Sequence, residues 1–75
     1  MNLNEKIRAV RKAKSVNQSL IADALHISVQ SYSMKETGKR PITTRELELI
    51  AEVLETPISN FFENEFNVKF NKSTA

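Results

Sequence analysis

The chain has 75 residues, which is enough for one compact domain and too few for a second hydrophobic core. Apolar residues make up 40% of it and charged residues 27%, with one Gly and two Pro, so the composition excludes a disordered chain and favours an all-α fold. The absence of cysteine excludes disulfides and thiolate-bound metals, and it suits the reducing cytoplasm. Since no stretch approaches the roughly 18 apolar residues of a membrane helix and no signal region is present, we expect a soluble cytoplasmic protein without membrane contact.

The net charge of +2 conceals an uneven distribution along the chain. Residues 1–45 contain nine Lys and Arg against three acidic residues, whereas residues 46–75 contain two against six. A basic surface binds a polyanion because neutralising phosphates releases their counterions. The first two-thirds of the chain is therefore a candidate surface for nucleic acid, although charge alone leaves open a basic surface that contacts only solvent.

The spacing of apolar residues predicts three helices in the first half of the chain. The first covers about residues 3–15, where apolar residues recur at i, i+4 and i+7 and basic residues occupy the opposite face. A second, short helix follows Asn17, a residue type that favours helix N-caps, and ends near His26. Ser28 is the predicted N-cap of a third helix over about residues 29–37, which is short and mostly polar.

Turn-forming and capping residues divide the middle of the chain. Gly38, the only glycine, is expected to close the third helix in the left-handed conformation that glycine tolerates. Pro41 then prevents the helix from continuing. Thr43 and Glu46 have the spacing of a capping box, which predicts a fourth helix over about residues 44–55.

Two apolar patterns follow the fourth helix. Pro57 and the apolar residues after it predict a short fifth helix that closes the core. Further on, Phe66, Val68 and Phe70 alternate with polar residues, which is the period of a strand or extended tail with one apolar face. Residues 71–75 are expected to be disordered.

The second and third predicted helices have the arrangement of a helix-turn-helix, in which the second helix of the pair lies in the major groove of DNA. The surrounding sequence resembles the lambda-repressor-like helix-turn-helix family, the group of Cro, phage repressors and XRE-type regulators. We therefore expect a five-helix DNA-binding domain over residues 1–63 and a tail over residues 64–75. The resemblance is carried by five segments: Ile7–Lys14, Asn17–Leu25, Glu36–Pro41, Ile50–Leu54 and Pro57–Phe62.

The resemblance implies roles for individual residues. Four positions of the third helix match base-contacting positions: Val29, Gln30, Ser33 and Met34. Five positions match contacts to DNA phosphates: Asn17, Gln18, Thr37, Lys39 and Arg40. Among the base contacts Gln30 has the clearest chemistry, because its amide can pair with both N6 and N7 of adenine, whereas Val29 offers only apolar contact such as with a thymine methyl. Arg11 and Glu36 match an ion pair between the first and third helices, and the alternative for them is two solvated charges.

Three residues depart from the family pattern. His26 stands where the family has a glycine, so it has to adopt a positive φ at a cost of roughly 1 kcal/mol. Tyr32 stands where isoleucine is common, and Lys35 where an aliphatic side chain is usually buried. We expect Lys35 to bury its stem and expose its ammonium group.

The expected function is that of a sequence-specific, double-stranded DNA-binding transcriptional regulator, and the family implies a repressor of phage or bacterial origin. A homodimer would place one third helix in each half of an inverted-repeat operator. The expected dimer contacts lie in the fifth helix and the tail: Phe61, Phe66, Val68 and Phe70. The alternative is that these phenylalanines fold back on the fifth helix.

The sequence also bears on two other classes of function. An enzyme is excluded by the inventory of side chains, since there is no Cys, one isolated His and no phosphate-binding loop; we expect no catalytic residue, no metal and no cofactor. A protein-binding module is the remaining alternative, in which the domain docks a toxin or protein antagonist through Val29, Tyr32 and Met34. Salt separates the two, because DNA binding weakens steeply with ionic strength and an apolar interface does not.

Overall fold

A computed structural model describes residues 2–62, and every element in this part of the chain is helical. The elements, in chain order, are α1 (Leu3–Ala13), α2 (Gln18–Leu25), α3 (Val29–Glu36), α4 (Thr44–Val53) and a 3-10 helix, η1 (Ile58–Phe61). None of these described helices has the length and apolar character needed to span a membrane.

Each α-helix begins at a polar side chain that accepts a hydrogen bond from the third backbone N–H of the helix. These N-caps are Asn2, Asn17, Ser28 and Thr43. In α1 and α4 a glutamate three residues after the cap, Glu5 or Glu46, accepts a bond from the N–H of the cap and completes a capping box. The caps set where α2 and α3 begin, and they therefore set the length of the turn between the two helices.

All four α-helices end in the same left-handed turn, although only one of the four turns has a glycine at the residue with positive φ. The residues with positive φ are Ser15 (58°), His26 (59°), Gly38 (87°) and Glu55 (50°). After each of them, the next backbone N–H donates to the carbonyl five residues earlier, as Ile27 does to Ala22, which is the Schellman motif. The expected positive φ of His26 is confirmed, and Ser15 and Glu55 carry the same strain of a side chain in the left-handed region.

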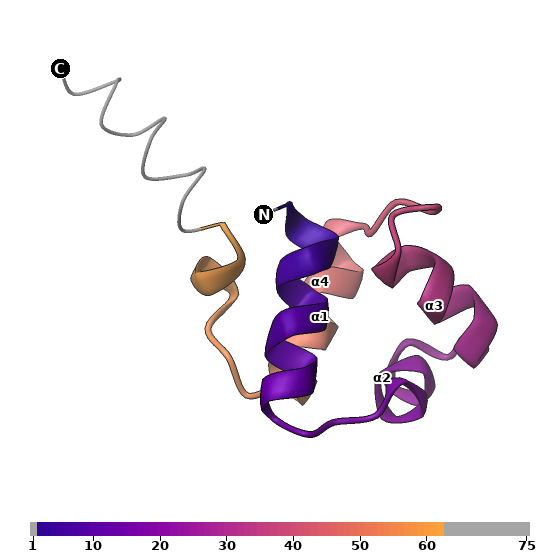
Figure 1. The fold of residues 1–75 in the computed structure, drawn as a ribbon, viewed down its shortest axis with the longest axis horizontal. Helices are drawn as coiled ribbons and strands as arrows, with labels where there is room; N and C mark the ends of the chain where they lie inside the picture. The colour runs from indigo at the N-terminus through magenta and orange to yellow at the C-terminus, as the bar shows by residue number, and fades with distance from the viewer. Residues whose placement is uncertain (1, 63–75) are drawn as a thin grey trace, which may run out of the picture.

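The core is formed by the inward faces of the helices. Nine apolar side chains are at most 5% exposed: Ile7, Ile21, Ala22, Tyr32, Leu47, Ile50, Ala51, Leu54 and Phe61. α2 packs on α3 and α4, while η1 packs against α1 and α4 on the side away from α2 and α3 (Figure 1). The scaffold formed by α1, α4 and η1 therefore leaves one side of the α2–α3 pair open to solvent.

The predicted helices begin where the observed ones do, but their predicted ends were too late. The first, third and fourth helices end at residues 13, 36 and 53, because each chain segment enters its Schellman turn before the residue with positive φ. The predicted short fifth helix is a single 3-10 turn, in which the N–H of Asn60 donates to the carbonyl of Pro57. Four residues are too few for a ladder of i→i+4 bonds. The predicted strand or tail over residues 64–75 lies outside the described residues.

Candidate nucleic-acid interface

The outer face of α3 carries the four residues predicted to contact bases: Val29, Gln30, Ser33 and Met34. Their spacing of i, i+1, i+4 and i+5 places them on one side of the helix. Val29, Gln30 and Met34 are exposed and Ser33 is half-buried, whereas Tyr32 and Glu36 on the opposite side are buried. The face therefore offers an amide, a hydroxyl and two apolar side chains, and no charge.

The N-terminus of α2 has backbone N–H groups for which residues 2–62 supply no acceptor. The Asn17 side chain accepts from the N–H of Leu20 at 2.9 Å and from the hydroxyl of Ser19 at 3.1 Å. Among residues 2–62, the backbone N–H groups of Gln18 and Ser19 have no acceptor. Free N–H groups at the positive end of a helix dipole are suited to bind a phosphate. Gln18 also donates from Nε2 to Glu36 Oε1 at 3.2 Å, which leaves a second amide hydrogen for an acceptor outside the protein.

The turn after α3 is wrapped around one carbonyl oxygen. The carbonyl of Met34 accepts from the backbone N–H of Lys39 at 2.8 Å and of Arg40 at 3.2 Å. Gly38 permits this path at a φ of 87°, where a Cβ would also lie 3.3 Å from Nδ2 of Asn4. The side chains of Lys39 and Arg40 are exposed, so the turn presents two cations next to the end of α3.

Thr37 uses its hydroxyl to close α3. Its Oγ1 lies 3.1 Å from the carbonyl oxygen of Ser33 and 3.2 Å from that of Met34. Because a hydroxyl has a single hydrogen, a phosphate contact from Thr37 requires this hydrogen to turn away from both carbonyls. The Thr37 hydroxyl is therefore less available for the predicted phosphate contact than the exposed side chains of Lys39 and Arg40.

Glu36 is the centre of a buried hydrogen-bond network that joins α1, α2 and α3. Arg11 donates from Nε to Oε2 at 2.8 Å and from Nη2 to Oε1 at 2.9 Å. The Tyr32 hydroxyl donates to Oε2 at 2.6 Å, and the Gln18 amide donates to Oε1 at 3.2 Å. Arg11 Nη1 donates in addition to the carbonyl of Val16, at 2.8 Å. The network fixes the N-terminus of α2 relative to the C-terminal half of α3.

The charges of the buried pair depend on one another. Burial alone would raise the pKa of the Glu36 carboxyl, but hydrogen bonds from Arg11, Tyr32 and Gln18 hold it below its ordinary value. The hydrogen bond to Glu36 raises the pKa of the Arg11 guanidinium. Burial, reinforced by the hydrogen bond to Glu36, raises the pKa of the Tyr32 hydroxyl. At neutral pH the pair is therefore charged and the tyrosine is a donor.

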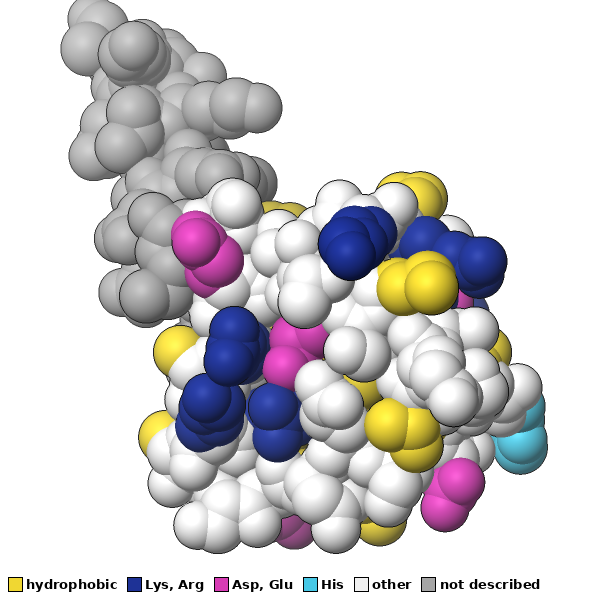
Figure 2. All heavy atoms as spheres, turned by 45° about the vertical axis from the view of Figure 1, so that its right-hand side comes forward, with side chains coloured by type: hydrophobic (Ala, Val, Ile, Leu, Met, Phe, Trp, Pro, Cys, Tyr) yellow, Lys and Arg dark blue, Asp and Glu magenta, His cyan; other side chains and the backbone are white. Residues whose placement is uncertain are grey.

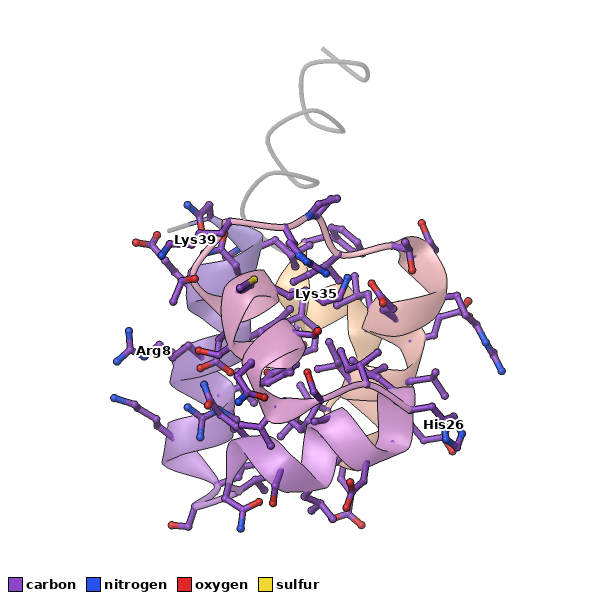
Figure 3. All side chains as sticks on the ribbon, turned by 90° about the vertical axis from the view of Figure 1, so that its right-hand side faces the viewer. Arg8, His26, Lys35 and Lys39 are labelled. Carbon is purple, nitrogen blue, oxygen red and sulfur yellow. The ribbon has the colours of Figure 1, made fainter. Side chains whose placement is uncertain are left out.

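Figure 2 shows two groups of basic side chains on one face, and the surface between them is uncharged except for an acidic side chain next to one group. One group belongs to α1, where Arg8 and Lys12 are exposed, and the other belongs to the turn that carries Lys39 and Arg40. Figure 3 places Arg8 and Lys39 on one side of the molecule and His26 on the opposite side. Cations next to an uncharged helix face suit a surface on which phosphates position the protein and the helix contacts bases.

Lys35 is not the exposed cation that the sequence predicted. Its Nζ donates to the carbonyl of Pro41 at 3.0 Å and to Glu46 Oε1 at 3.1 Å, and its side chain is 13% exposed. The ammonium group turns toward α4 because a carbonyl and a carboxylate there replace water as acceptors. The sequence missed this pair, since Glu46 was fully explained by its capping box and nothing in the spacing relates it to Lys35.

Phe61 lies in the core of the described chain, so its side chain is not on the surface where the sequence predicted a dimer contact. Its side chain is 2% exposed, because η1 turns it inward against α1 and α4. The carbonyl of Phe61 also accepts from Lys6 Nζ at 3.4 Å. The neighbouring Phe62 is 37% exposed. The other three predicted dimer contacts lie outside the described residues: Phe66, Val68 and Phe70.

Comparison with known proteins places the chain by its sequence alone. Searches of curated proteins and of solved structures return no significant match. The helix-turn-helix family model HTH_3 matches residues 7–61, well over half of the chain. The match extends from α1 through η1 and includes α2, α3 and the turn between them. The chain belongs to this XRE and lambda-repressor-like helix-turn-helix family, a family of DNA-binding domains.

Proposed function

We propose that the protein is a sequence-specific, double-stranded DNA-binding transcriptional regulator, a repressor, that inserts α3 into the major groove. The observation that carries this proposal is the exposed, uncharged face of α3 between two sources of phosphate contacts. These are the free N–H groups at the start of α2 and the turn of Lys39 and Arg40. An α-helix fits the width of the major groove of B-DNA, about 12 Å.

The side chains on α3 define which bases the protein contacts. Gln30 is exposed, and its amide pairs bidentately with N6 and N7 of an adenine. Val29 and Met34, at 42% and 39% exposure, provide apolar surface for the methyl group of a thymine. We infer a half-site with at least one A·T pair opposite Gln30. Ser33 can donate to or accept from any base and adds little discrimination.

We further propose that the protein binds an inverted repeat as a homodimer, with two copies of α3 about 34 Å apart along the DNA. A single eight-residue helix contacts too few base pairs to define an operator, and a two-fold axis doubles the number. Phe62 is an exposed aromatic side chain next to η1 and supports a contact there. Sedimentation velocity of the wild type and of Phe62→Ser tests this, and a monomeric wild type at micromolar concentration would contradict it.

Titration of labelled duplexes by fluorescence anisotropy tests DNA binding itself. The expected result is binding to random duplex that falls linearly in log–log form with salt concentration, and tighter binding to DNA upstream of the gene for this protein. Absence of binding to any duplex at low salt would remove the proposed function.

A protein-binding module is the second candidate, favoured by exposed apolar side chains on the same face. Leu20 on α2 is 53% exposed, and Val29 and Met34 on α3 are exposed as well; such side chains suit a toxin or a protein antagonist. Tyr32, which the sequence assigned to this surface, is fully buried and is corrected to a core residue. Complex formation that is insensitive to salt would favour this candidate over DNA.

A further inference from the structure

The side chain of Lys35 ties α3 to the start of α4 across the turn between them. Its Nζ lies 3.0 Å from the carbonyl oxygen of Pro41 and 3.1 Å from Glu46 Oε1. The same Glu46 oxygen accepts from the backbone N–H of Thr43 at 3.0 Å. The side chains of Lys35 and Glu46 are 13% and 21% exposed, so water screens this contact less than it screens a surface ion pair.

The turn spanned by this contact carries Lys39 and Arg40. At its beginning, the backbone N–H groups of both residues are fixed to the carbonyl of Met34. At its end, the carbonyl of Pro41 is fixed by Lys35. Within residues 2–62 neither Lys39 nor Arg40 forms a salt bridge, and both side chains are exposed. The path of the backbone therefore sets where the two side chains leave the turn.

We propose that Lys35 and Glu46 are positioning residues, which hold the turn between α3 and α4 in the shape that presents Lys39 and Arg40 to DNA phosphates. The proposal rests on the proposed DNA-binding function. Lys35 acts through the turn rather than by a phosphate contact of its own, since two of the three hydrogens of its ammonium group point to Pro41 and Glu46.

If Glu46 has this role, neutralising its carboxylate should change the affinity for DNA in the direction opposite to the usual one. Removing a negative charge from a DNA-binding protein normally strengthens its attraction to the polyanion. If Glu46 holds the basic turn through Lys35, its neutralisation weakens DNA binding instead. Glu46→Gln is a suitable variant, because glutamine also completes a capping box and the start of α4 is retained. Glu48→Gln is the matched control, since Glu48 is exposed on the same helix and, in the part of the chain that the structure describes, pairs only with Arg45, at 3.6 Å.

The experiment compares the affinity of the wild type and the two variants for random duplex over a range of salt concentrations. We expect Glu46→Gln to bind about fivefold more weakly and with a shallower salt dependence, because phosphate contacts are lost. We expect Glu48→Gln to bind at least as tightly as the wild type. Equal or stronger binding by Glu46→Gln would overturn the proposal. If the wild type binds no DNA, the proposed function itself fails, and the phosphate role of the turn fails with it.

Two further measurements separate positioning from general stability and from direct contact. Amide hydrogen exchange in the free protein should accelerate at Lys39 and Arg40 in Glu46→Gln and stay unchanged in Glu48→Gln; unchanged exchange in both would overturn the proposal. Lys35→Met should weaken DNA binding in the wild type but cause no further loss in a Lys39→Gln, Arg40→Gln background. Additive losses would mean that Lys35 contacts phosphate directly, which also overturns it.

Discussion

Arg11 and Glu36 meet in a two-point contact, Nε to Oε2 at 2.8 Å and Nη2 to Oε1 at 2.9 Å, at the junction of α1, α2 and α3. The two residues are 9% and 3% exposed, so neither charge has water to replace its partner. Through Gln18, which donates to the same carboxylate, the pair also reaches the start of α2. The position of α2 relative to α3 therefore depends on this buried ion pair.

Breaking this pair from the side of Arg11 should destabilise the fold strongly. Arg11→Met leaves the Glu36 carboxylate buried with hydrogen bonds but without a countercharge, and we expect the free energy of unfolding to fall by about 3 kcal/mol. Arg8→Met, on the exposed face of the same helix, should change it by less than about 0.5 kcal/mol. Urea denaturation followed by circular dichroism measures both, and equal effects would refute the structural role of the pair.

Glu36 should make the stability sensitive to acid. Its pKa in the folded protein lies below the ordinary value of 4.5, so below that value the unfolded chain takes up protons before the folded one does. The contribution of Glu36 is fully present above pH 4.5 and is lost as the pH falls through the lowered folded pKa. Unfolding free energies measured at several acidic pH values should therefore decrease less steeply for Glu36→Gln than for the wild type. Parallel decreases would assign the acid sensitivity to other carboxyls.

The left-handed residues at the helix ends should respond to glycine according to their φ. Ser15→Gly and Glu55→Gly relieve the strain of a side chain at φ 58° and 50°, and each should stabilise the fold by about 0.5 kcal/mol after the cost in unfolded-state entropy. Gly38→Ala should destabilise it by about 1 kcal/mol, because φ is positive there and a Cβ meets the Asn4 side chain. Thermal unfolding of the three variants gives the signs, and destabilisation by Ser15→Gly or Glu55→Gly would disprove the strain.

The features that the sequence predicted correctly depend on residues that are close together in the sequence. Asn17, Ser28 and Thr43 mark helix starts because capping is a local hydrogen bond to the third N–H of the same helix. The ends at Ser15 and Glu55 were placed too late, because no glycine marks them. The match of the chain to its family supplied the positive φ of His26, which its residue type alone does not indicate.

Spacing and composition did not predict contacts between segments that are far apart in the sequence. The ion pair of Lys35 with Glu46 joins two helices whose approach depends on packing of the core. The Tyr32 hydroxyl lies one helical turn from Glu36, so the i, i+4 spacing of the two residues was a signal for their hydrogen bond. The apolar ring of Tyr32 was instead assigned to a protein-binding surface. The buried position of Phe61 likewise follows from the geometry of η1, which the apolar pattern did not define.

Loss of a phosphate contact should weaken binding to all DNA equally. Lys39→Gln removes one exposed cation of the turn after α3, and the slope of log affinity against log salt should become shallower by about one. The loss should be the same for random duplex and for the tightest-binding sequence, because phosphates carry no sequence information. Anisotropy titrations with both duplexes measure this, and a loss confined to one of them would contradict a phosphate role.

The central claim is that the exposed face of α3 distinguishes DNA sequences, and the ratio of affinities for a selected site and for random duplex tests it most directly. The site is first selected from a random pool by the wild type, and the ratio is then measured for the wild type, Gln30→Ala and Lys39→Gln. The account predicts that Gln30→Ala lowers the ratio by at least about tenfold through loss of a bidentate base contact, whereas Lys39→Gln leaves it unchanged. A ratio that survives Gln30→Ala intact would contradict the account.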